Sequence, residues 1–165
     1  MFKEIKPNVY TFGVLVDCLC KQGLVNVSKL FINIILKQGL QVDLICYTTQ
    51  VSKYFVFNDV QNAMKLFYLL LNRVINDDSQ VYNTMISGCC RMKLFDDATR
   101  LLQEMSSKNI KPDVVSYGII IDSYFHLGEM YGAWKLFYEM EQKGIKSDFV
   151  IYTCMLYGLL KSHQS

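Results

Sequence analysis

The stretch that decides the fold spans residues 79–113 and reads SQVYNTMISGCCRMKLFDDATRLLQEMSSKNIKPD. The next 35 residues, 114–148, read VVSYGIIIDSYFHLGEMYGAWKLFYEMEQKGIKSD and repeat its pattern of apolar positions. Each copy ends on an acid, which recurs every 35 residues at Asp43, Asp78, Asp113 and Asp148. A fixed period in this range is typical of a solenoid, in which no copy can bury its apolar face alone. Such an array predicts binding along an extended surface rather than in one catalytic pocket.

The recurring acid sets the boundaries that we expect for the copies. Four full repeats are predicted, and a partial repeat follows them: 9–43, 44–78, 79–113, 114–148 and 149–165. Residues 1–8 resemble the end of a preceding repeat, because Ile5-Lys6-Pro7-Asn8 is similar to Ile110-Lys111-Pro112-Asp113. We therefore expect a piece of a longer array or a truncated gene product.

Each copy carries two helical patterns separated by a break. Within 79–113, Tyr82, Ile86 and Cys90 follow the i, i+4, i+8 spacing of one helical face. The breaks fall at Gly23, Asn58, Lys93 and Gly128. Glycine and asparagine suit a helix end at positive φ, whereas lysine should strain that turn. No strand pattern competes, so the chain is predicted to be an all-α, right-handed α-solenoid of helix-turn-helix repeats.

Two further positions in the copies indicate how the helices should pack. The fourth residue is aromatic in every copy and is expected in the core: Phe12, Tyr47, Tyr82, Tyr117 and Tyr152. In the second half of three copies, a small residue is expected where two helices approach closely: Ala63, Ala98 and Ala133.

Composition excludes several classes of protein. The chain is 52% hydrophobic, and its net charge of +2 is too mild to indicate a polyanion partner by itself. No apolar run approaches the roughly 18 residues of a membrane span, and no targeting peptide precedes the first repeat. The six cysteines form no C-x-x-C pair, so we expect structural thiols and no metal. No catalytic constellation stands out, and we expect neither an enzyme nor a cofactor.

Several motifs together resemble the pentatricopeptide repeat family. They are the aromatic-Asn-Thr opening at Tyr82-Asn83-Thr84, the stretch Ala133-Trp134-Lys135-Leu136-Phe137 and the Lys111-Pro112-Asp113 closing. The resemblance covers residues 5–163, and the uniform repeat length looks like the P subclass common in plant organelles. It implies a location in a mitochondrion or chloroplast, and a role in RNA processing, stability or translation.

Members of this family bind single-stranded RNA at about one base per repeat. The resemblance implies that the fifth and closing residues of each copy address the base edge: Gly13 with Asp43, Thr48 with Asp78, Asn83 with Asp113, Gly118 with Asp148, and Thr153. We call these the base-reading residues. In the family, Thr with Asp favours guanine and Asn with Asp favours uracil, which implies a G-U core. Glycine offers the base no side chain, so repeats one and four should discriminate weakly.

Two further sets of contacts follow from the same resemblance. The second residue of each copy should pack against the base: Tyr10, Ile45, Gln80, Val115 and Val150. The thirteenth residue is basic in four of five copies and suits a phosphate backbone: Lys21, Arg91, His126 and Lys161. Cations at these positions would also stabilise helix C-termini, and the closing acids could simply cap the next helix. Both simpler interpretations stay open from the sequence.

Two alternatives to RNA recognition also stay open. A helical solenoid can be a scaffold that binds proteins. The chain can also be a degenerate remnant, because Gln50, Ser52 and Lys53 replace apolar or small residues in the second copy. No polar capping helix is visible, so exposed end faces are expected to self-associate.

Overall fold

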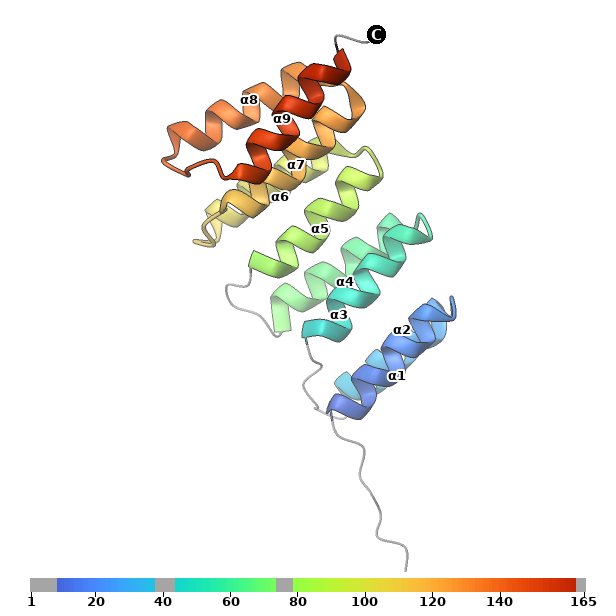
Figure 1. Cartoon of the computed structure of the whole chain (residues 1–165). Helices are drawn as coiled ribbons and strands as arrows, with labels where there is room; N and C mark the ends of the chain where they lie inside the picture. Colours follow the sequence, from blue (N-terminus) through green and yellow to red (C-terminus); the bar gives the residue numbers. More distant parts are fainter. Residues whose placement is uncertain (1–8, 38–43, 74–78, 163–165) are drawn as a thin grey trace, which may run out of the picture. The chain divides into compact units, whose positions relative to one another are not determined.

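The computed structural model describes residues 9–37, 44–73 and 79–162, and within them it contains only helices (Figure 1). The helices are α1 (Val9–Lys21), α2 (Val25–Lys37), α3 (Leu44–Val56), α4 (Val60–Arg73), α5 (Ser79–Arg91), α6 (Phe95–Ser107), α7 (Val114–Leu127), α8 (Met130–Gln142) and α9 (Phe149–Ser162). The all-α prediction is confirmed. No helix among these residues has the length and apolar character that crossing a membrane requires.

The chain divides into two compact units, Met1–Asn76 and Asp77–Ser165. In the first unit α1 packs on α2, α3 packs on α4, and the two pairs meet mainly through α1 and α3. In the second unit α5 packs on α6 and α7 on α8, while α5, α7 and α9 lie side by side (Figure 1). Within each unit, the first helix of one helix pair therefore packs on the first helix of the next pair. The limits of single repeats stay a prediction.

The turns inside the helix pairs follow from local chemistry. Gly23 and Gly128 have φ of 78° and 80°, and Asn58 and Lys93 adopt the same left-handed region at 59° and 61°. At Lys93 the backbone N–H donates to Cys90 O, and the next N–H donates to Cys89 O. This pair of bonds is the Schellman arrangement that ends helices. The predicted breaks are confirmed, and the lysine carries the strain that a side chain incurs at positive φ.

The core forms where the apolar stripes predicted it. Tyr47, Tyr82 and Tyr117 are fully buried. The small residues Ala63, Ala98 and Ala133 are also fully buried, as expected at close helix contacts. Phe12 lies outside the side chains that the structure describes. Tyr152 departs from the prediction, since it is 52% exposed. Among the described residues, α9 has no second helix packed over this face, whereas α6 and α8 cover α5 and α7.

A recurring polar contact joins the two helices of a pair in the second unit. The Tyr82 hydroxyl donates to Glu104 Oε1 at 3.0 Å, and the Tyr117 hydroxyl donates to Glu139 Oε1 at 3.1 Å. Each glutamate also pairs with a lysine one turn later, Lys108 at 2.9 Å and Lys143 at 2.8 Å. The buried tyrosine ring thus fills the core while its hydroxyl is satisfied at the edge of the second helix.

Candidate nucleic-acid interface

The structure places the fifth residue of each first helix at the same point of that helix. Asn83 in α5 and Gly118 in α7 are half-buried, and Thr153 in α9 is exposed. Because α5, α7 and α9 lie side by side and each residue holds the fifth position of its helix, we expect these three residues to form a row across the second unit. Thr48 holds the same position in α3 of the first unit and is half-buried.

Part of the predicted site falls outside the described structure. Asp43 and Asp78 lie outside the described residues. Tyr10, Gly13, Ile45 and Lys161 belong to described helices, but their side-chain positions also lie outside what the structure describes.

The two closing acids that are described both cap a helix. Asp113 Oδ1 accepts from the backbone N–H of Ser116 at 2.9 Å, and the Ser116 hydroxyl completes a capping box. Asp148 Oδ1 accepts from the backbone N–H of Ile151 at 2.9 Å. The capping interpretation is therefore confirmed for these residues. Each cap uses Oδ1, so the Oδ2 atom of each acid retains acceptor capacity.

Asn83 differs from its neighbours in its hydrogen bonding. Its Oδ1 is buried and accepts no hydrogen bond from the described part of the protein. A buried acceptor left unpaired costs about 1–3 kcal/mol. Thr153 is satisfied locally, because its hydroxyl donates to Phe149 O at 2.8 Å. Asn83 is thus the fifth residue with most to gain from an external donor.

The second residues of α5, α7 and α9 face solvent. Val115 and Val150 are 54% and 63% exposed, and Gln80 is exposed as well. An exposed valine at the start of a helix offers an apolar surface of a few carbon atoms. This valine lies three residues before the fifth residue, so the two side chains are neighbours on the helix surface and can contact the same ligand.

The basic residues at the thirteenth position of the repeats lie in the last turn of their helices. Lys21 pairs with Asp17 at 2.6 Å, and this partner raises the pKa of Lys21. His126 Nδ1 lies 3.2 Å from Asp122 Oδ1 and 2.9 Å from the Asp122 carbonyl oxygen. These pairs within one helix agree with the helix-terminus interpretation. The same ion pairs orient the side chains of Lys21 and His126, two of the residues predicted to contact phosphate.

A shallow pocket of about 240 Å³ lies where the ends of α5 and α7 meet. Its polar lining is Arg91, Lys93, Asp122, Ser123 and His126. Two permanent cations therefore face a carboxylate and a hydroxyl across one groove. This arrangement can hold a small ligand that combines an anion with a hydrogen-bond donor.

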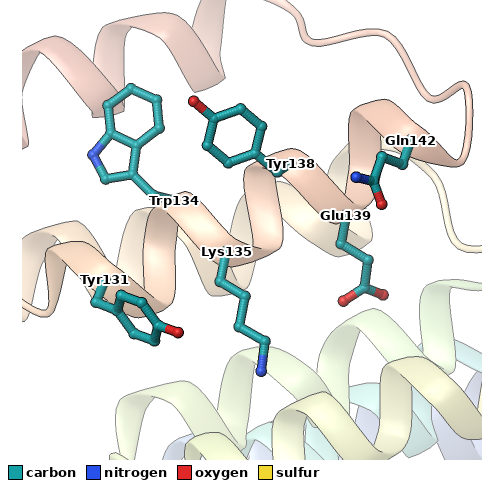
Figure 2. Close-up of a pocket in the computed structure, with 6 residues that line it drawn as sticks. All are labelled: Tyr131, Trp134, Lys135, Tyr138, Glu139 and Gln142. Carbon is teal, nitrogen blue, oxygen red and sulfur yellow. The ribbon is translucent and has the colours of Figure 1, made fainter.

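A second pocket of about 510 Å³ lies on the second helix α8 (Figure 2). Three aromatic residues line it, Tyr131, Trp134 and Tyr138, and the rest of the lining is Lys135, Glu139 and Gln142. Tyr131 is 83% exposed and Tyr138 is 60% exposed. Sequence motifs did not single out this surface, because second-helix aromatics are hard to distinguish from core residues in a sequence.

The two buried cysteines of α5 do not form a reactive site. Burial raises the pKa of Cys89 to about 12 and that of Cys90 to about 11. A thiol with such a pKa stays protonated near neutral pH and is a poor nucleophile or metal ligand. Among the described residues, no three His, Cys, Asp or Glu side chains gather where they could hold a metal ion.

Sequence comparison identifies the repeat. The profile of the PPR repeat family matches residues 77–126 and 112–161, and a PPR repeat profile matches residues 3–28. A pentatricopeptide repeat-containing protein of Arabidopsis thaliana is 31% identical over 87 residues. That match covers 53% of this chain and 12% of the relative, so the chain spans only a small part of that protein's length.

Comparison with solved structures supports the solenoid. The crystal structure of the pentatricopeptide repeat protein PPR10 from maize superimposes with a TM-score of 0.80 at 24% identity. PPR10 in complex with an 18-nt psaJ RNA element gives a TM-score of 0.78, also at 24% identity. Each match covers 96% of this chain and 23% of PPR10.

Proposed function

The chain belongs to the pentatricopeptide repeat family, and on that basis we propose that it binds single-stranded RNA at about one base per repeat. A related fold has been solved with RNA, since PPR10 forms a complex with an 18-nt psaJ element. The proposal assigns no catalytic step to this chain. Its action is recognition, and the chemistry on the RNA belongs to other parts or partners.

The observation that carries the proposal is that the fifth residue of α5 and of α7 lies in a helix that packs on the next first helix, which a closing acid caps. Asn83 lies in α5, and Asp113 begins the neighbouring helix α7 that packs against it. Gly118 and Asp148 have the same relation one repeat later. A row with a fixed repeat is what a polymer with regularly spaced bases requires.

Asn83 is the strongest candidate for reading a base. Its amide provides a donor and an acceptor, which can pair with the uracil edge. The buried, unpaired Oδ1 supports this role, because a base N–H would supply the missing donor after a side-chain rotation. Thr48 with Asp78 is proposed to favour guanine, and the core preference is then G followed by U.

The remaining contacts hold the strand in place. Val115, Val150 and Gln80 are proposed to pack against bases, with Ile45 and Tyr10 in the same role in the first two repeats. A stacked aromatic such as Tyr10 contributes about 1–3 kcal/mol per base at such sites. The backbone is proposed to follow the thirteenth column: Lys21, Arg91, His126 and Lys161.

The test is binding of the whole chain to short RNAs that contain G-U or a scrambled core. The G-U strand should bind more tightly, and Asn83→Ala should remove most of the preference for uracil. A matched control is Gln103→Ala, which alters an exposed side chain on the second helix α6. Equal and negligible binding of both RNAs at low salt would refute the proposal.

The biological setting follows from the family. We propose that the protein acts on organellar transcripts, in a mitochondrion or chloroplast, in RNA processing, stability or translation. Fluorescent fusions to the full gene product would locate it directly. A nuclear or cytosolic signal with no organellar fraction would contradict this setting.

A second candidate function is binding of a protein partner through α8. The specific observation is the exposed pair Tyr131 and Tyr138 beside Trp134, because aromatic residues are enriched in protein interfaces (Figure 2). A partner that survives nuclease treatment and is lost with Tyr131→Ala and Tyr138→Ala would support it. Unchanged capture by the double variant would exclude this surface.

A further inference from the structure

The ninth residue of every repeat carries an oxygen on its side chain. The residues are Asp17, Ser52, Ser87, Asp122 and Tyr157. Each lies four residues after the fifth residue and four residues before the thirteenth, which places all three on one face of the helix. The proposed function uses the fifth and thirteenth residues and assigns the ninth residue no contact with RNA. Within the protein, Asp17 and Asp122 pair with the thirteenth residues Lys21 and His126 of their own helices.

The ninth column is accessible in the structure. The side chains of Asp17 and Asp122 are 35% and 42% exposed, and Tyr157 is 54% exposed. Ser52 and Ser87 are half-buried. Polar side chains that recur at one partly exposed position of an otherwise apolar helix are available to a ligand that runs across the helices.

Neighbouring repeats bring the ninth and thirteenth columns together. Arg91 ends α5 and shares the pocket of about 240 Å³ with Asp122 of α7. One repeat later, the rings of His126 in α7 and Tyr157 in α9 lie 5.8 Å apart. In both cases the thirteenth residue of one repeat lies beside the ninth residue of the next. The pairing thus occurs twice across the first helices α5, α7 and α9 of the second unit.

The spacing along the helix matches the dimensions of a nucleotide. At about 1.5 Å per residue, Asp122 lies about 6 Å beyond Gly118, and His126 about 12 Å beyond it. A base held at the fifth residue would then place its sugar toward the ninth residue and its phosphate toward the thirteenth. The pocket at Arg91 and Asp122 offers a cation for the phosphate and an acceptor for a sugar hydroxyl.

We propose that the ninth residue of each repeat, with Asp122 as the clearest case, accepts a hydrogen bond from the ribose 2′-hydroxyl and makes the array select RNA over DNA. This inference rests on the proposed function and deepens it. The 2′-hydroxyl is the group by which a protein distinguishes the two nucleic acids at a given site. Asp122 accepts this hydrogen bond without any covalent step, while Arg91 of the preceding repeat pairs with the adjoining phosphate.

The experiment compares the whole chain with Asp122→Ala on two probes. One is an RNA containing the G-U core, and the other is a DNA of the same base sequence with deoxyuridine. Wild type should bind the RNA more tightly than the DNA. In the variant, the ratio of RNA affinity to DNA affinity should fall about tenfold, as expected for a hydrogen bond to a charged acceptor. Asp122 also repels phosphates on both probes, so the RNA-to-DNA ratio is the quantity to compare.

A scan of single 2′-deoxy substitutions locates the contact. At one position of the RNA the substitution should weaken binding to wild type by about tenfold and binding to Asp122→Ala by much less. Asp97→Ala is the matched control, since Asp97 pairs with Arg100 on α6 of the same unit, outside the ninth column. Ser87→Ala is the second test variant if Asp122→Ala does not fold, and it should shift the sensitive position by one nucleotide.

The outcomes separate the two proposals. Suppose that wild type binds the G-U RNA specifically, but each 2′-deoxy substitution lowers the affinity of wild type and of the ninth-residue variants by the same factor. The ribose contact is then refuted, while the proposed reading of RNA bases stands. The ribose contact is likewise refuted if Asp122→Ala and Asp97→Ala have the same RNA-to-DNA ratio as wild type. If wild type shows no specific binding to either probe, the proposed function fails and this inference fails with it.

Discussion

Gly118→Asn is the sharpest test of base reading, because it adds a reading side chain where the repeat has none. Gly118 lies inside α7, and a Cβ added there would meet Ile151 Cγ1 at 3.7 Å, an ordinary van der Waals distance. Its backbone is helical, so no positive φ penalises a side chain. Asparagine and glycine differ little in helix propensity, and we expect the stability to change by less than about 0.5 kcal/mol.

The expected gain in specificity can be estimated from one hydrogen bond. The new amide would hold the same position in α7, ahead of the helix that Asp148 begins, as Asn83 holds in α5 ahead of the helix that Asp113 begins, and we expect it to pair with a uracil edge. A neutral hydrogen bond contributes about 0.5–1.5 kcal/mol, which corresponds to roughly two- to tenfold tighter binding of the correct base. The preferred core then grows from G-U to G-U-U.

Fluorescence anisotropy with four RNAs, in which each base in turn follows G-U, measures this directly. Gly118→Ala is the control, since it adds the Cβ without the amide and should bind all four RNAs as wild type does. A urea melt of each variant shows that it is folded. If folded Gly118→Asn binds the four RNAs with equal affinity, the assignment of the fifth residue to base reading is wrong.

Three further predictions concern stability and association. Urea unfolding should give Gly158→Ala a free energy of unfolding about 1–3 kcal/mol lower than that of Gly118→Ala, because the new Cβ would lie 2.8 Å from Phe125 Cγ. Equal free energies of unfolding would contradict this packing of α9 on Phe125. Lys93→Gly should raise the melting temperature by about 2–4 °C by relieving the left-handed strain, and a lower melting temperature would show that the lysine side chain outweighs it. The chain should self-associate through α9, where Leu156 and Leu160 are 62% and 66% exposed, and analytical ultracentrifugation measures this. The double variant Leu156→Ser with Leu160→Ser should self-associate less, and a monomeric wild type would refute the prediction.

The turns and caps could be predicted because their causes lie within a few residues. Gly128 ends α7 at φ 80° since glycine has no Cβ to clash, and Asp113 begins the same helix by accepting from the backbone N–H of Ser116. Lys93 shows the same logic with an unsuitable residue, because the bonds of the turn hold even a lysine at φ 61°. Short-range steric and hydrogen-bonding rules are sufficient for such features.

The contacts between helices could not be predicted in the same way. The hydrogen bond from Tyr117 to Glu139 joins residues 22 apart, and the sequence pattern marked the tyrosine only as a core position. Tyr152 holds the same place in its repeat yet is 52% exposed, since burial depends on which helix covers it. The aromatic surface at Tyr131 and Tyr138 was missed for the same reason.

The sequence by itself determined the period, the helical class and the identity of the residues at each repeat position. These follow from a 35-residue recurrence and from local rules that each copy obeys independently. Only the tertiary structure decided which of those positions meet. Arg91 and Asp122, far apart in the chain, share one pocket because α5 and α7 pack side by side. Such a meeting depends on helix packing, which acts between residues distant in sequence.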